Sequence, residues 1–168
     1  MKRAEYQAKI AEIPEESIVY VDECGIDEHL TRIYAKSPAG VPVYGEVKGR
    51  KYERTNIIAG KCGGKIVAPG EYKKSTNHRL FEVWFREALL KEVRVGSVIV
   101  LDNATFHRKK TLAALAENAG CSVLFLPPYS PDLNSIEVEW ANLKTFIRNY
   151  GFQFRSVSFA IAHYFNVA

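Results

Sequence analysis

Two apolar, β-branched runs in the 168-residue sequence each end in an aspartate. The run IVYV is followed by Asp22, and the run VIVL is followed by Asp102. Runs of this kind are typical of strands that are buried on both faces. If the two strands are parallel neighbours, both acids lie at the same carboxyl edge of the sheet, where open α/β sheets bind ligands. One aspartate after a strand is usually a turn residue, so the pair needs supporting evidence from the rest of the chain.

The remaining patterns predict a mixed sheet around these strands. Helices are expected at 2–13, 76–93, 109–120 and about 133–150, short antiparallel strands within 31–72 with a turn at 62–64, and a third buried strand at 121–128. Antiparallel strands therefore come first and a parallel α/β half follows. This order predicts an α/β fold with a mixed central β-sheet flanked by helices, compatible with a ribonuclease-H-like architecture.

Composition is that of a globular chain, with 47% hydrophobic and 25% charged residues, and the length fits one domain. No apolar run approaches the ~20 residues of a membrane span, and the charged N-terminus lacks the apolar stretch of a signal peptide. We therefore expect no membrane association and a cytoplasmic, nucleoid location. The three cysteines are far apart and odd in number, which favours reduced thiols over a metal or disulfide framework.

Charge is unevenly distributed along the chain. Residues 1–28 carry three basic and eight acidic side chains, whereas residues 46–79 carry nine basic and three acidic ones. A basic segment beside an acidic one suits a polyanion held near a carboxylate site that binds cations. Solvated loop lysines would produce the same distribution, so a phosphate-binding segment and an ordinary solvated loop both stay open as interpretations.

The last predicted helix offers a third acid. Asn134 and Glu137 have the spacing of a capping box, so Glu137 could simply serve the helix N-terminus. A helical wheel at ~100° per residue places Glu137 half-buried beside the apolar stripe, on a flank shared with Lys144 and Arg148. Glu139 falls on the opposite flank. Glu137 is therefore the better candidate for a site shared with the aspartates. The stripe itself consists of Leu133, Ile136, Trp140, Leu143 and Ile147.

Three carboxylates predict a particular chemistry. Clustered carboxylates repel one another unless cations neutralise them. Hard oxygen ligands suit Mg²⁺ or Mn²⁺, and two such ions ~4 Å apart activate a nucleophile and stabilise a leaving oxygen in phosphodiester cleavage. Asp22, Asp102 and Glu137 are thus predicted to hold two divalent ions.

With these residues in hand, the sequence resembles the catalytic domain of a DDE-type transposase, of the bacterial insertion-sequence group related to the mariner superfamily. The motifs that carry the resemblance are VYVDECG, VIVLDNATFH and LPPYSPDLNSIEVEWANLK, and 34 residues separate Asp102 from Glu137. The third motif is the most specific of them. The similarity runs from about residue 17 to 150, and Ser135 stands where the family usually has proline.

The resemblance implies a ribonuclease-H-like fold in which Asp22, Asp102 and Glu137 form the metal-binding catalytic triad. Asn103 and His107 match the second motif, and His107 is expected either near the scissile phosphate or as a structural partner of the strand edge. The residues that match the third motif are expected to shape the turn that presents the catalytic glutamate. They are Tyr129, Ser130, Pro131, Asp132 and Asn134.

The resemblance also implies DNA cleavage at transposon ends and joining to target DNA. Two alternatives remain open: a metal-dependent nuclease without strand transfer, and a truncated regulator that does not catalyse. Residues 1–16 are expected to form a helical extension ahead of the catalytic domain at 17–168, with no room for the helix-turn-helix that such transposases carry. Self-association or a partner chain is expected to supply it. The residues expected to contact DNA phosphates are Lys48, Arg50, Lys51, Arg54, Lys73, Lys74, Lys144 and Arg148.

Overall fold

The structure is a computed structural model that describes residues 2–27, 36–42, 44 and 54–167. Its strands are β1 (Ile18–Asp27), β2 (Arg54–Cys62), β3 (Lys65–Tyr72), β4 (Val98–Leu101) and β5 (Ser122–Phe125). Its α-helices are α1 (Arg3–Ala11), α2 (His78–Trp84), α3 (Leu90–Glu92), α4 (Lys109–Asn118), α5 (Ile136–Tyr150) and α6 (Val157–Val167). A π-helical turn, Phe85–Leu89, joins α2 to α3, and short 3₁₀ turns lie at Glu15–Ser17, Pro131–Leu133 and Gly151–Gln153.

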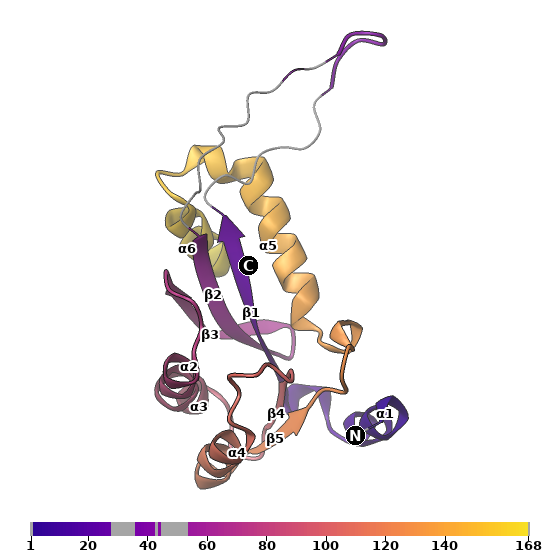
Figure 1. Ribbon diagram of the computed structural model, residues 1–168, viewed down its shortest axis with the longest axis vertical. Coiled ribbons are helices and arrows are strands. Elements are labelled where there is room, and N and C mark those ends of the chain that lie inside the picture. Colours follow the sequence, from indigo (N-terminus) through magenta and orange to yellow (C-terminus); the bar gives the residue numbers. More distant parts are fainter. Residues whose placement is uncertain (1, 28–35, 43, 45–53, 168) are drawn as a thin grey trace.

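The five strands form one mixed sheet in the order β3-β2-β1-β4-β5 (Figure 1). Strand β1 is antiparallel to β2 and parallel to β4, and β4 is parallel to β5. The predicted mixed α/β sheet is therefore confirmed. Within the parallel pair, Tyr20 lies opposite Val100, so two residues further on each chain Asp22 and Asp102 come side by side. The two acids therefore lie together as expected, but only β4 ends there, since β1 continues past Asp22 to Asp27.

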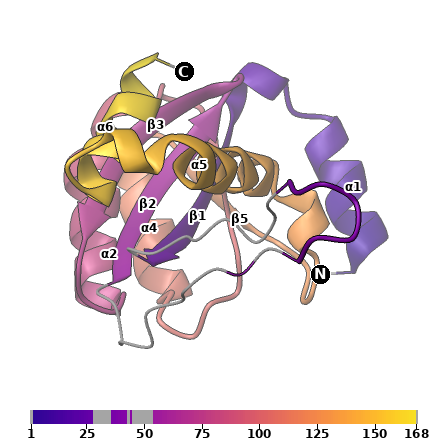
Figure 2. The ribbon, with the colours of Figure 1, turned by 90° about the horizontal axis from the view of Figure 1, so that it is seen from above.

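Helices cover both faces of the sheet, giving three layers (Figure 2). On one face Val19 and Val21 pack with Phe81, Phe85 and the other buried residues of α2, its π-helical turn and α4. Because side chains alternate along a strand, the residues between them point to the other face. There Cys24 and Ile26 of β1 pack with the apolar stripe of α5 and with α6. Asp22 and Glu23, consecutive in β1, thus lie on opposite faces.

Several local predictions are confirmed and some boundaries move. The side chain of Asn77 caps α2 by accepting a hydrogen bond from the backbone N–H of Leu80 at 3.0 Å. Gly63 and Gly64 form the β2–β3 turn with positive φ angles of 51° and 80°. The last long helix begins at Ile136 and not near Leu133, because Pro131–Leu133 form a 3₁₀ turn. Helix α6 was not predicted.

Helix α1 packs against the start of the third motif. Tyr6, 1% exposed, lies in a small core with Ile18 and Leu126, and Leu133 packs against that core. The guanidinium of Arg3 donates two hydrogen bonds to the carboxylate of Asp132. These contacts hold the loop between β5 and α5 against the N-terminal helix.

Candidate active site

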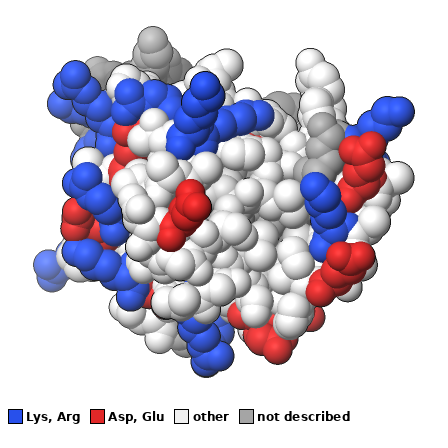
Figure 3. Space-filling view, turned by 90° about the horizontal axis from the view of Figure 1, so that it is seen from below, with Lys and Arg blue, Asp and Glu red and all other residues white. Residues whose placement is uncertain are grey.

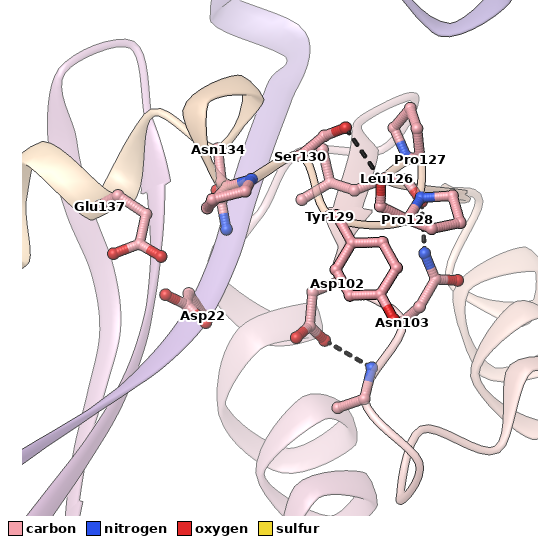
Figure 4. Close-up of a pocket in the computed structure, with 12 residues that line it drawn as sticks. Asp22, Asp102, Asn103, Leu126, Pro127, Pro128, Tyr129, Ser130, Asn134 and Glu137 are labelled. Carbon is pink, nitrogen blue, oxygen red and sulfur yellow. Dashed lines mark hydrogen bonds between the residues drawn. The ribbon is translucent and has the colours of Figure 1, made fainter. Parts of the chain in front are cut away.

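Asp22, Asp102 and Glu137 line one pocket of about 440 Å³ at the carboxyl edge of β1 and β4 (Figure 4). Asp22 comes from β1, Asp102 directly follows β4, and Glu137 lies in the first turn of α5. In the close-up, the carboxylates of Glu137 and Asp22 face each other, and that of Asp102 lies across the pocket. The structure therefore brings the three predicted acids to one cavity.

Asp22 is held on the α5 side of the sheet. The indole N–H of Trp140 donates a hydrogen bond to its carboxylate at 3.0 Å. Burial raises the pKa of Asp22 to about 7, and a hydrogen bond from the backbone of Glu23 acts in the opposite direction. The neighbouring carboxylates, that of Glu137 first, add to the increase in the pKa. An acid in this setting gains from any cation that enters the pocket.

Asp102 has the opposite balance. Burial works to raise its pKa, but hydrogen bonds from the His107 ring and from the backbone N–H of Ala104 outweigh it, so the pKa lies below its usual value. The distances to its Oδ1 are 3.0 Å from the ring Nδ1 and 3.0 Å from the backbone N. The carboxylate is ionised and fixed in orientation.

His107 is the buried partner of Asp102 and not a pocket residue. Its ring packs against Phe81 at a tilt and against Phe106 edge-on, at centroid distances of 4.2 and 4.5 Å, and its Nε2 lies 3.8 Å from Oε1 of Glu23. Burial lowers the pKa of His107, but the hydrogen bond to Asp102 and the nearby carboxylate of Glu23 raise it to about 9. Of the two expectations for this residue, the geometry favours the partner of the strand edge.

Glu137 differs from the sequence expectation in one respect, because its side chain is exposed and not half-buried. The first turn of α5 opens onto the pocket, which leaves its flank uncovered. The capping box also does not form: the N-cap of α5 is Ser135, without a side-chain cap, and the Asn134 amide donates to the backbone oxygen of Val21 at 3.4 Å. Glu139 points away, with its carboxylate 3.6 Å from the Lys61 ammonium.

Two asparagines support the acids. Asn134 is 4% exposed and lines the pocket, and its Oδ1 is buried without a hydrogen-bond partner in the described part of the chain. Asn103 donates to the backbone oxygen of Leu126, and its Oδ1 accepts from the Lys109 ammonium at 2.5 Å. Asn103 thereby ties the end of β4 to the loop of the third motif.

The donor set suits a hard divalent cation. Among residues 2–27, 36–42, 44 and 54–167, no three His, Cys, Asp or Glu side chains come together closely enough to hold one ion. Mg²⁺ does not need such a cluster, since it is usually bound by one or two carboxylates, with water and phosphate completing its shell. The three carboxylates that line the pocket therefore suit ions that are each bound by only one or two of them.

The candidate phosphate contacts divide into groups. Lys48, Arg50 and Lys51 lie outside the described residues. The guanidinium of Arg54 lies against Gly25, where an added Cβ would come within 1.9–2.2 Å of it. The remaining basic candidates are Lys73 and Lys74, which are exposed, and Lys144 and Arg148, which are partly buried on α5.

Lys144 is a basic candidate on the same side of the sheet as Asp22. Its ammonium lies beside the thiol of Cys24, whose pKa is raised by burial and lowered by Lys144. Since Cys24 follows Asp22 by two residues on the same strand, Lys144 and Asp22 share one face of the sheet. On the lower face of the molecule, basic side chains crowd the upper left of the view (Figure 3).

Sequence reasoning missed two residues of the site. Glu23 contacts His107 from the opposite face of β1, and the alternation of strand side chains would have placed it there. Trp140 was assigned only to the apolar stripe, although it lies three residues after Glu137 and its indole N–H needs an acceptor when buried.

The mixed sheet flanked by helices is the ribonuclease-H-like fold, and comparisons with known proteins identify the class of enzyme that carries it here. Residues 17–158 match the family model described as DDE superfamily endonuclease. The chain therefore belongs to the DDE superfamily endonucleases, which confirms the predicted family and enzyme class. Comparison with curated proteins finds no match.

Solved structures of Mos1 transposase share the fold. The paired-end complex with the left transposon end matches with a TM-score of 0.68 at 17% identity, over 86% of this chain and 46% of that chain. The strand transfer complex gives 0.66 at 18% identity, over 83% and 44%. The catalytic domain with Raltegravir and Mg gives 0.64 at 15% identity, over 97% and 77%. The chain thus spans about half the length of the Mos1 chains in the two DNA complexes.

None of the helices in the described part of the chain is both long and apolar enough to cross a membrane.

Proposed function

We propose that the chain is the catalytic domain of a transposase that cuts phosphodiester bonds at transposon ends and joins the ends to target DNA. Asp22, Asp102 and Glu137 are its catalytic residues, and they hold Mg²⁺ or Mn²⁺, two ions in all. The observation that carries this proposal is the convergence of the three acids on one pocket, from the middle of β1, the end of the parallel strand β4 and the first turn of α5.

The two ions would supply activation of the attacking oxygen and stabilisation of the leaving oxygen in an in-line displacement. In cutting, the attacking oxygen belongs to water; in joining, it belongs to the hydroxyl of the cut end. Each step forms one P–O bond while another breaks, so one pocket serves both. The structures of Mos1 with Mg and in a strand transfer complex support this proposal by fold.

The protein's own contribution is to hold its carboxylates ready. His107 and the backbone N–H of Ala104 fix an ionised Asp102. Trp140 orients Asp22, whose pKa is raised by burial first and by the neighbouring carboxylates second. A cation that enters the pocket relieves the repulsion between the carboxylates, and this relief strengthens its binding. Preorganised ligands of this kind cost little reorganisation at the moment of reaction.

DNA is held through its phosphates. Lys144 and Arg148 extend from the Glu137 flank along α5 and give a backbone track that starts at the pocket. Arg54, Lys73 and Lys74, and the sequence candidates Lys48, Arg50 and Lys51, would add affinity without reading bases. Recognition of a specific end sequence requires helices inserted in a groove, which we assign to self-association or to a partner chain.

A DNA cleavage and joining assay in Mg²⁺ tests the catalytic acids. Glu137→Gln should abolish both cleavage of transposon-end DNA and joining of precut ends, because the variant loses a cation ligand at the pocket. Glu139→Gln is the matched control on the same helix and should retain most activity, since a glutamine still accepts the hydrogen bond from Tyr164. The reverse pattern would show that the other flank of α5 faces the substrate.

The same assay separates the alternative functions. Cleavage without joining of precut ends would identify a nuclease that hydrolyses DNA only. Absence of both activities in a folded chain that binds Mn²⁺ would favour a regulator. The presence of all three acids in one pocket speaks against the regulator, because a non-catalytic chain would not need to maintain their mutual repulsion.

A further inference from the structure

Tyr129 combines strain with complete exposure. Its φ angle is +53°, in the left-handed region, and Ala68 is the only other non-glycine residue with a positive φ among the described residues. That conformation is unfavourable for a residue with a Cβ. The side chain is 101% exposed, so it repays none of this by packing. A glycine or asparagine would make the same turn at lower cost, so the fold does not require a tyrosine here.

The loop that carries Tyr129 is rigidly held. On one side Asn103 binds the backbone oxygen of Leu126, and on the other Arg3 binds Asp132. The hydroxyl of Ser130, 6% exposed, donates to the backbone oxygen of Pro128 at 3.2 Å. The strained backbone is therefore fixed by its surroundings, and the exposed ring projects from a preorganised support.

The ring projects at the catalytic pocket. Tyr129 lines the same cavity as the three acids, and Figure 4 shows it above Asp102 on the side away from Glu137. Leu126, Pro127 and Pro128 form an apolar wall beside it. Within the described part of the chain its phenol makes no hydrogen bond. The pocket thus has carboxylates suited to cations that bind phosphate, and at its rim the exposed ring of Tyr129, which suits a flat apolar group.

We propose that Tyr129 stacks on an unpaired nucleobase next to the scissile phosphate. This inference rests on the proposed function, since it takes DNA as the substrate. A base inside a duplex is already stacked on both faces, so the ring can reach only a base that is frayed, overhanging or extruded. Every base offers a π-face, so the contact would favour unpaired DNA without reading its sequence.

The inference is tested by DNA binding and not by turnover. The full chain is titrated in Ca²⁺ against two DNAs, a blunt duplex and a duplex end with a three-nucleotide overhang that carries 2-aminopurine beside the junction. Tyr129→Ala should weaken binding of the overhang DNA by about 5- to 100-fold and abolish quenching of 2-aminopurine fluorescence. Binding of the blunt duplex should change less than about twofold. Tyr129→Phe and Tyr129→Trp should retain both the affinity and the quenching.

Two further variants sharpen the result. Tyr129→Gly removes the left-handed strain, so it should raise the melting temperature while binding overhang DNA as weakly as Tyr129→Ala. Tyr150→Ala, at a half-exposed tyrosine near the far end of α5, is the matched control and should change neither DNA. Equal affinity of Tyr129→Ala and wild type for the overhang DNA would overturn the inference, as would an equal loss in Tyr129→Phe.

The outcomes also separate this inference from the proposed function. If the wild type cuts and joins DNA while Tyr129→Ala binds overhangs normally, only the stacking inference fails. If the wild type binds overhang DNA but never cuts DNA, and Tyr129→Ala loses the overhang binding, the stacking inference stands and the catalytic proposal fails.

Discussion

Replacing Asp22 with asparagine should stabilise the metal-free protein at neutral and alkaline pH while removing metal-dependent activity. Asparagine has nearly the same shape, and its amide oxygen still accepts the hydrogen bond from the indole N–H of Trp140. What disappears is a buried negative charge that faces other carboxylates. A residue kept for cation binding is expected to cost stability when the cations are removed.

The magnitude follows from the raised pKa. Burial and the neighbouring carboxylates move the pKa of Asp22 from 3.8 to about 7. Below the unfolded value of 3.8 the group is neutral in both states, and its contribution to stability is fully present. As the pH rises through the folded value near 7, that contribution is lost, because the folded state must then ionise a carboxyl that is easier to ionise in the unfolded chain. The full difference is on the order of 4 kcal/mol.

The assay is urea unfolding of wild type and Asp22→Asn in EDTA at several pH values from 4 to 8.5. The variant's advantage in free energy of unfolding should be near zero at the acid end and grow to a few kcal/mol above pH 7. Adding Mg²⁺ should stabilise the wild type by mass action and narrow the gap. An advantage that does not change with pH would refute the reasoning, because it would show that packing, and not charge, separates the two proteins.

Two other predictions concern the supports of the site. His107→Asn keeps a hydrogen-bond donor near the position that contacts Asp102, whereas His107→Gln places its amide towards Glu23. The affinity for Mn²⁺ is measured from the EPR signal of free Mn²⁺. It should fall about tenfold or more in the glutamine variant and much less in the asparagine variant. Equal losses would show that the imidazole acts only through packing. Lys144→Ala and Arg148→Ala should each weaken DNA binding and reduce the slope of log affinity against log salt by about one. Lys91→Ala, paired with Glu87 on the surface, is the control, and an equal change there would argue against a track along α5.

The features that the sequence predicted correctly are those set by local period and chain direction. Asp22 and Asp102 could be placed together because each follows a fully apolar run and the two runs form parallel neighbouring strands, although β1 continues past Asp22 to Asp27. The choice of Glu137 over Glu139 rested on the helical period of α5, and the structure places them on different flanks. That Asp22, Asp102 and Glu137 bind metal ions stays a prediction.

The features that were missed depend on contacts distant in sequence. Helix α6 has apolar residues around much of its circumference, and it packs against the preceding helix α5 and against β3, which lies far back along the chain. The exposure of Glu137 depends on the loop before α5, whose 3₁₀ turn shifts the helix start. The burial of His107 depends on Phe81, 26 residues away in sequence, and no periodic pattern connects the two.

The 34-residue interval between the second and third acids has a structural explanation. From Asp102 the chain must leave the sheet edge, run back along α4 and return through β5 before it can present Glu137 at the same edge. Parallel strands require a crossover of a dozen residues or more, and residues 103–125 of the interval contain that crossover, with helix α4 and the four-residue strand β5. The remaining residues before α5, 126–135, are the loop to which Asn103 and Arg3 bind at Leu126 and Asp132. The interval is thus the length of one crossover plus one anchored loop, and that same loop carries Tyr129. An insertion in it would move Glu137 and the aromatic rim together, whereas the far end of α4 lies away from both.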